Sequence, residues 1–181
     1  MGEKPQVKLR ALEPEDLNFL YEIENDEMIW NVGLTNVPYS KNLLLDYIAS
    51  SSGDIFSDKQ VRMIIVNERG EDVGMVDLID FSPAHQRAEL GLVIKSSFRR
   101  QGYASATLAK IKEYAKNIVH LHQIYAIVPQ NNVACAEMLE NVGFQRVHSL
   151  KDWLFDGESY HDADFFQIFC KKVAEKFGGT K

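Results

Sequence analysis

The chain has 181 residues, of which 45% are hydrophobic and 25% charged, and its formal net charge is −6. This length is expected to give one domain with a substantial core, and the negative charge argues against general binding to nucleic acid or anionic lipid, which are also negative. No apolar run approaches the roughly 20 residues that span a bilayer, and the first residues lack the core of a secretory signal, so we expect a cytoplasmic protein with no membrane partner.

The first half of the chain is predicted to contain a strand, two helices and three further strands. Apolar and polar residues alternate over Gln6–Arg10, as in a half-buried strand. Pro14 with the two acidic residues after it marks a helix start, and Ser40 is a candidate N-cap for a second helix. After a serine-rich loop at 50–54, strands are expected at 62–67, 72–81 and 88–94, with a hairpin turn at 68–71.

The second half is predicted to contain a helix, a strand, a helix and two closing strands. The expected positions are 102–119, 124–128, 132–141 and both sides of the turn at Asp156-Gly157. The order β-α-α-β-β-β-α-β-α-β-β indicates an α+β fold with a mixed sheet and helices on its faces. We expect residues 1–175 to form a single domain and residues 176–181 a flexible tail.

A short basic loop, Arg99-Arg100-Gln101-Gly102-Tyr103-Ala104, joins a predicted strand to a predicted helix. Such a connection can bind an anion, because the first N–H groups of a helix have no partner within it and the helix dipole adds positive charge. Gly102 permits a positive φ and a close approach of phosphate oxygens, while Arg99 and Arg100 add fixed charge. An ordinary connection with solvated arginines is the alternative. The loop has neither a Walker ending nor a three-glycine dinucleotide fingerprint, which argues against a kinase.

Together with its surroundings, this loop resembles the GNAT acetyltransferase superfamily over nearly the whole chain. Arg99 to Ala104 matches the family motif Arg/Gln-x-x-Gly-x-Gly/Ala. Val128 to Asn132, Ala136 to Leu139 and Gly143-Phe144 are similar to the family's strand, Asn-initiated helix and Gly-Phe ending. The resemblance implies the GNAT fold, with a central, mostly antiparallel mixed sheet of about seven strands, about four flanking helices and splayed central strands.

The resemblance also implies a coenzyme A site that takes acetyl-CoA as the acetyl donor, with no metal. The pyrophosphate would lie on the N–H groups of residues 100–105. The pantetheine arm would pair with the strand at 88–94 like an added strand, and the thioester would lie between that strand and the one at 124–128. The residues expected to bind the coenzyme are Leu92, Val93, Ile94, Arg99, Arg100, Gln101, Gly102, Tyr103, Ala104, Ser105 and Asn132.

Within the superfamily the chain is most similar to spermidine N-acetyltransferases and ribosomal-protein alanine N-acetyltransferases, in its opening at 7–17 and at 85–89. Two departures argue against a polyamine acceptor. The tyrosine before Gly-Phe that spermidine acetyltransferases carry, believed to protonate the departing thiolate, is Leu139 here. Residues 33–38, in the region of their acidic polyamine contacts, contain no carboxylate, although a di- or trication needs several to replace its hydration.

Acyl transfer to an amine needs a base for one proton and a donor for the oxyanion. Strand alternation places Glu89, Gly91 and Val93 on one face, so we predict Glu89 as the base, with Gly91 leaving room for substrate. An ion pair from Glu89 to Arg87 or another arginine is an equal alternative. The backbone N–H of Val93 or Ile94 is the candidate oxyanion donor if the strand bulges there.

Several other side chains have a functional and a purely structural interpretation. Tyr103 and Tyr160 are candidates for the general acid, although tyrosines more commonly pack. The two cysteines have no metal-ligand spacing and are expected to be free thiols; direct transfer needs no nucleophilic Cys135. The residues that either line an acceptor groove or belong to the core are Trp30, Tyr39, Tyr47 and Phe81.

We therefore expect an acyl-CoA-dependent N-acyltransferase that moves an acetyl group from acetyl-CoA directly to a primary amine of a small molecule or of a peptide or protein N-terminus. A catalytically weak acetyl-CoA-binding module or sensor is the alternative, because the expected tyrosine is missing. A homodimer is expected from the family resemblance, and no nucleic-acid partner is expected.

Overall fold

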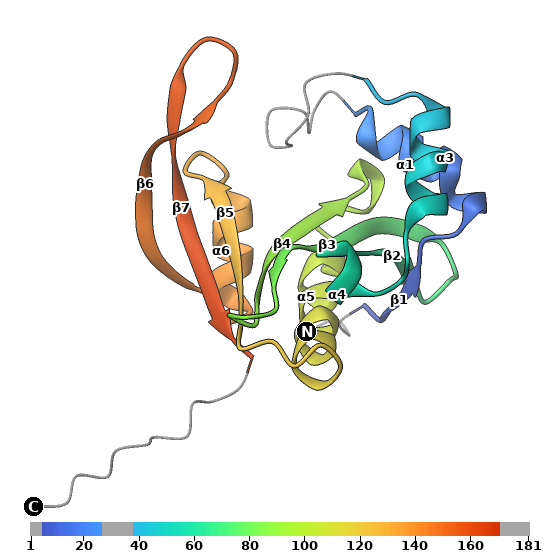
Figure 1. Ribbon diagram of the computed structural model, residues 1–181. Coiled ribbons are helices and arrows are strands. Elements are labelled where there is room, and N and C mark those ends of the chain that lie inside the picture. Colours follow the sequence, from blue (N-terminus) through green and yellow to red (C-terminus); the bar gives the residue numbers. More distant parts are fainter. Residues whose placement is uncertain (1–4, 27–37, 171–181) are drawn as a thin grey trace, which may run out of the picture.

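The computed structural model describes residues 5–26 and 38–170, and its seven strands form one sheet in the order β1-β2-β3-β4-β5-β7-β6 (Figure 1). The strands are β1 (Val7–Ala11), β2 (Val61–Asn67), β3 (Asp72–Ser82), β4 (Arg87–Ile94), β5 (Gln123–Pro129), β6 (Gln145–Phe155) and β7 (Tyr160–Phe169). All neighbours are antiparallel except β4 and β5, which are parallel. The predicted mixed, mostly antiparallel sheet is confirmed.

Five α-helices and two short 3₁₀ segments accompany these strands in the described residues. They are η1 (Pro14–Asp16), α1 (Leu17–Glu24), α3 (Lys41–Ser50), α4 (Ile55–Asp58), η2 (Ser96–Phe98), α5 (Tyr103–Asn117) and α6 (Val133–Asn141). The predicted order is confirmed, and Ser40 caps α3 by accepting from the Leu43 N–H. Sequence analysis missed α4, because four residues are too few to show helical periodicity. None of these helices is long and apolar enough to cross a membrane.

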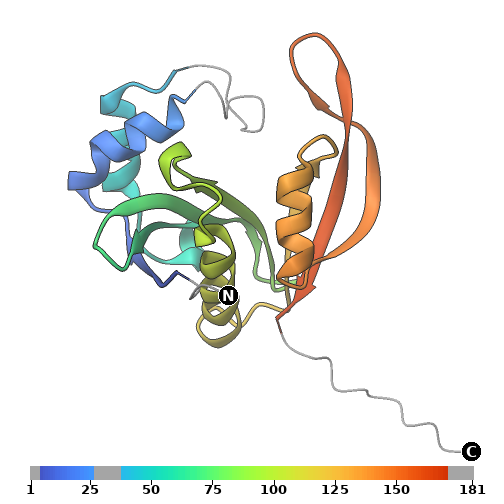
Figure 2. The same cartoon turned by 180° about the vertical axis from the view of Figure 1, so that it is seen from behind.

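Two apolar clusters, one on each face of the sheet, hold the helices in place (Figures 1 and 2). The larger one packs α5 and α6 against the sheet, and the smaller one packs α1 and α3 on the opposite face. Strand β4 contributes to both, because Leu90, Leu92 and Ile94 contact the first cluster and Val93 contacts the second. The predicted alternation along this strand is therefore confirmed, and it directs Glu89 and Gly91 toward the side of α1 and α3.

The parallel ladder between β4 and β5 is short, and the two strands then diverge (Figure 1). Only residues 87–89 of β4 pair with β5, at residues 123–125, whereas β3 pairs with β4 as far as Ile94. Beyond this point β5 pairs only with β7. The edge of β4 over residues 90–94 consequently lacks a strand partner on its β5 side among the described residues.

Part of the sequence interpretation concerns residues outside the described ranges. These are Trp30, most of the segment at 33–38 and the predicted tail at 176–181. Of the remaining aromatic candidates, Phe81 belongs to the larger core cluster, while Tyr39 and Tyr47 pack beside the smaller one.

Candidate active site

The predicted phosphate loop forms the start of α5, and no side chain of the described residues caps its first backbone N–H groups. Gly102 is the N-cap residue, with a φ of 87°, and Arg100 also has a positive φ of 60°. Positive-φ residues next to ordinary ones turn successive N–H groups toward one side, which is the backbone geometry of anion-binding nests. With the dipole of a 15-residue helix behind it, this turn is suited to phosphate.

Two side-chain hydrogen bonds tie the loop to the end of β4 and to the 3₁₀ segment η2 that follows it. Arg99 Nε donates to the Ile94 carbonyl oxygen at 2.9 Å, and Gln101 Nε2 donates to the Ser97 carbonyl oxygen at 2.9 Å. The side chains of Arg99 and Arg100 are otherwise exposed to solvent. The free edge of β4 and the uncapped turn of α5 are thus held next to each other, so one ligand can contact both.

The other predicted coenzyme-binding residues lie in three different places: the first turn of α5, the free edge of β4 and the start of α6. Ala104 and Ser105 are half-buried in the first turn of α5, whereas the Tyr103 side chain is buried against Phe98, so only its backbone faces the loop. Leu92, Val93 and Ile94 lie on the free edge of β4. Asn132 caps α6, where its side-chain oxygen accepts from the Cys135 N–H at 3.2 Å.

The register shows where strand irregularity occurs near the site. Pairing of β3 with β4 is continuous from Gly74 opposite Ile94 to Ile79 opposite Glu89, so the bulge that would expose an N–H of Val93 or Ile94 is absent. The irregularity lies in β3 instead, between Ile79 and Ser82. Bulges commonly re-aim side chains next to active sites, and this one changes the direction of Asp80.

Glu89 lies at the end of the parallel ladder, directly opposite Tyr125. Burial raises the pKa of the Glu89 carboxyl above its usual range, the negative charge of Asp80 raises it further, and a hydrogen bond from Tyr125 opposes both. No lysine or arginine of the described residues lies within ion-pair distance of Glu89. The alternative of an ion pair to Arg87 is therefore wrong, and the raised pKa makes this carboxyl a stronger proton acceptor than an ordinary glutamate.

Sequence analysis missed an ion cluster beside Glu89. Arg62 on β2 makes a two-point contact with Asp77 on β3 and a further contact with Glu24 of α1. The guanidinium carbon of Arg62 lies over the Tyr47 ring, 5.4 Å from the ring centroid. A side chain at Gly91 would meet the Asp77 Cβ at 3.2 Å, so Asp77 borders the space beside Gly91. In the sequence, the charged residues at inward-facing positions of β2 and β3 are the feature from which this cluster could have been predicted.

A second missed feature is the contact of Tyr125 with Asp80. The Tyr125 hydroxyl donates to Asp80 Oδ2 at 2.8 Å, and its ring is stacked on Phe165 with centroids 5.3 Å apart. Asp80 has a φ of 49°, in the left-handed region that residues other than glycine rarely adopt. Nothing in the local sequence signals this contact, because the two residues are 45 positions apart.

Neither tyrosine candidate for the general acid lies beside Glu89, and Leu139 takes the position of the tyrosine found in spermidine acetyltransferases. Leu139 is 1% exposed within the larger core cluster, and Tyr103 belongs to the same cluster on the α5 face. Tyr160 lies at the exposed hairpin end of β7. Cys135 is a free thiol whose pKa is raised by burial, which disfavours the thiolate that a nucleophile needs.

The arrangement as a whole can hold an anionic group at the start of α5 and an extended chain along β4. It can also accept a proton at Glu89, where the two strands separate. These are the requirements of transfer from a phosphate-bearing donor with an amide-containing arm.

Comparisons with known proteins agree with this chemistry. A family model described as an acetyltransferase (GNAT) domain matches residues 6–145. The chain is 26% identical to the spermidine N(1)-acetyltransferase of Escherichia coli K12 over 169 residues, covering 93% of this chain and 89% of the relative.

Solved structures give the same result. The spermidine N-acetyltransferase of Vibrio cholerae in complex with CoA and spermine is 26% identical, with a TM-score of 0.81, over 91% of this chain and 95% of that chain. A dodecameric structure of the V. cholerae enzyme is 25% identical, with a TM-score of 0.79, over 94% and 97% of the two chains. The family predicted from the sequence is confirmed: the chain belongs to the GNAT acetyltransferases and is an acetyl-CoA-dependent N-acetyltransferase.

Proposed function

We propose that acetyl-CoA binds with its pyrophosphate on the first turn of α5 and its pantetheine arm along the free edge of β4. The observation that carries this proposal is the proximity of an uncapped helix start to a strand edge without a partner. Residues 100–105 would supply N–H groups to phosphate oxygens, and Arg99 and Arg100 would add charge. Pantetheine amides would pair with the backbone of Leu92, Val93 and Ile94 as an added strand does.

Asn132 has a narrower role in this proposal than in the sequence analysis. Its side-chain oxygen is engaged in capping α6, while its amide nitrogen makes no hydrogen bond to the described residues. The amide nitrogen would therefore donate to a carbonyl of the arm. The cap itself fixes the side chain in the orientation that this contact requires.

Glu89 is proposed as the base. An alkylammonium acceptor with a pKa near 10.4, as for lysine, loses a proton to become nucleophilic and a second one during attack. The amine nitrogen attacks the thioester carbonyl carbon, the C–N bond forms and the C–S bond breaks. Glu89 takes the proton that leaves nitrogen and passes it to solvent, and the departing thiolate takes up a proton.

The acceptor is proposed to be a small primary amine that arrives as a cation. Neither Glu89 nor Asp80 has a lysine or arginine within 4.0 Å in the described part of the chain, so a monocation is attracted to this place. Spermidine should be a poor acceptor, because Leu139 cannot act as an acid and residues 33–38 hold no carboxylate. The resemblance to spermidine acetyltransferases makes this the sharpest question about the acceptor.

A panel of amines tests the acceptor directly. Release of free thiol from acetyl-CoA would be measured with spermidine, a small monoamine and a peptide with an N-terminal alanine. Turnover of the monoamine above spermidine is expected. Efficient spermidine turnover would overturn the acceptor proposal, and tight acetyl-CoA binding without turnover of any amine would favour the sensor alternative.

Glu89→Gln tests the base. The variant keeps the shape of the side chain, so we expect turnover to fall by on the order of a hundred- to ten-thousand-fold, with an almost unchanged dissociation constant for acetyl-CoA. Glu137→Gln, on the exposed surface of α6, is the matched control. Equal turnover in the two variants would remove Glu89 from the mechanism.

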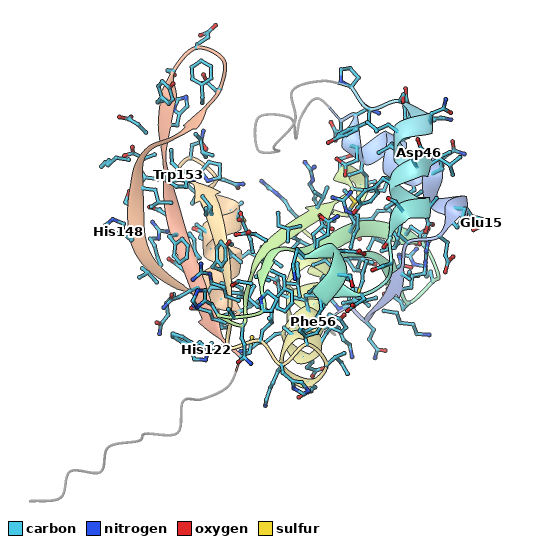
Figure 3. All side chains as sticks on the ribbon, viewed as in Figure 1. Glu15, Asp46, Phe56, His122, His148 and Trp153 are labelled. Carbon is cyan, nitrogen blue, oxygen red and sulfur yellow. The ribbon has the colours of Figure 1, made fainter. Side chains whose placement is uncertain are left out.

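Assembly as a homodimer and a cytoplasmic location stay predictions. The arm formed by β6 and β7 extends beyond the end of β5 (Figure 1), and Trp153 lies on it (Figure 3). Trp153, Phe155 and Tyr160 are all more than half exposed. Large exposed apolar side chains grouped on one element commonly mark a protein contact, so we assign the dimer interface to this arm.

A further inference from the structure

Three side chains meet where β4 and β5 separate. Glu89 and Tyr125 form the last pair of the parallel ladder, and Asp80 comes from the bulge of β3 on the other side of β4. The Tyr125 hydroxyl donates its proton to Asp80 at 2.8 Å, and both side chains affect the pKa of the Glu89 carboxyl. One tyrosine and two carboxyl groups, contributed by three strands, therefore interact at this point.

The conformation of Asp80 indicates that this contact is held in place by the surrounding fold. A non-glycine residue in the left-handed region is uncommon, and such residues persist only where neighbouring structure determines them. The stacking of Tyr125 on Phe165 fixes the other partner, at an interplanar angle of 14°. Both ends of the hydrogen bond are thus rigid.

We propose that Asp80 and Tyr125 are positioning residues for Glu89, which together hold its carboxyl at the divergence of the strands and set the pH at which it accepts a proton. This inference rests on the proposed role of Glu89 as the base. Asp80 accepts the hydroxyl proton of Tyr125. Glu89 then accepts the proton of the acceptor amine, because the single hydroxyl proton of Tyr125 is already bound to Asp80.

Charge and hydrogen bonding act on Glu89 in opposite directions. The charge of Asp80 disfavours a second negative charge and raises the pKa of Glu89, whereas the Tyr125 hydroxyl lowers that pKa, because its proton lies on Asp80 and offsets part of the charge there. Tyr125 itself stays protonated, because burial and then its bond to Asp80 raise its pKa above the usual range.

Two other sets of charged side chains lie near Glu89 in the described part of the chain. Arg87, two residues earlier on β4, acts on Tyr125 through its positive charge. Asp77 lies next to Gly91 and is paired with Arg62, which also pairs with Glu24. Asp80 and Tyr125 are therefore the two neighbours whose replacement changes the proton affinity of Glu89 in a predictable sense.

Two conservative variants should shift the titration of Glu89 in opposite directions. Asp80→Asn keeps a residue that tolerates the left-handed region, and it should move the acid limb of kcat/KM to lower pH. Tyr125→Phe keeps the stacked ring, and it should move that limb to higher pH. Asp46→Asn on the outer face of α3 (Figure 3) and Tyr114→Phe on α5 are matched controls and should leave the profile unchanged.

A direct titration separates this inference from the proposed role of the base. The side-chain carboxyl of Glu89 would be followed by carbon NMR in the full chain, with the signal assigned by its loss in Glu89→Gln. Opposite shifts of its midpoint in the two variants are expected, whatever the activity of Glu89→Gln. Midpoints that stay at the wild-type value, or move together, would overturn the inference. If neither variant folds, a wild-type midpoint in the ordinary range for glutamate would overturn it.

Discussion

Gly102 offers the sharpest test of the coenzyme site, through replacement by valine. At a φ of 87°, a non-glycine residue costs about 1–2 kcal/mol. In a chain of this size 1 kcal/mol corresponds to about 2–4 °C, so the melting temperature should fall by roughly 2–8 °C. A Cβ at Gly102 would also lie 3.1 Å from the Cδ of Pro5, which adds a small steric cost. The variant should therefore fold, with moderately lower stability.

Binding of acetyl-CoA should suffer far more than stability. A valine side chain would cover the N–H groups that are proposed to receive the pyrophosphate, and each hydrogen bond to a charged group contributes about 1.5–3 kcal/mol. Loss of two such bonds corresponds to about 3–6 kcal/mol, or a dissociation constant weaker by roughly a hundred- to ten-thousand-fold.

Calorimetric titration with acetyl-CoA at two salt concentrations measures this effect, and wild-type binding should weaken as salt rises because charged contacts are screened. Gly70→Val is the matched control, because Gly70 has a similar φ of 80° but its Cβ would meet no atom within 4 Å. Both variants should lose stability, and only Gly102→Val should lose binding. Equal affinities in two folded variants would refute the assignment of the loop.

Three further predictions concern stability and assembly. Arg62→Met should lower the free energy of unfolding, measured in urea, by about 3 kcal/mol, because the Asp77 carboxylate, which is 13% exposed, loses its guanidinium partner. Arg69→Met removes an exposed ion pair and should change the free energy by at most about 1 kcal/mol, so similar losses in the two variants would contradict this prediction. Arg10 holds the pKa of the Asp16 carboxyl below its usual range, so this ion pair stabilises the fold at pH values above the unfolded-state pKa, and the stabilisation is lost as the pH falls through the folded-state pKa. The difference in melting temperature between wild type and Asp16→Asn should therefore shrink on acidification, and a constant difference would contradict this role of the pair. Trp153→Lys should convert a dimer to a monomer in sedimentation velocity, and an unchanged sedimentation coefficient would place the interface elsewhere.

Local pattern was sufficient to predict the order of elements and the position of the helix that follows the basic loop. Apolar spacing depends on which face of one element is buried, and this is encoded within each segment. The turn at Gly102 was predictable for the same reason, because a glycine at a helix start permits the positive φ that residues with a side chain avoid. Glu89 was placed on the correct face of β4 by alternation alone.

The surroundings of Glu89 were decided only by the tertiary structure. The alternative arginine partner is absent among the described residues, and Asp77 borders the space beside Gly91. The contact of Asp80 with Tyr125 depends on a bulge in β3 and on the point where β4 and β5 stop pairing. Strand register and bulges arise from the packing of the whole sheet, so no segment of the sequence contains them by itself.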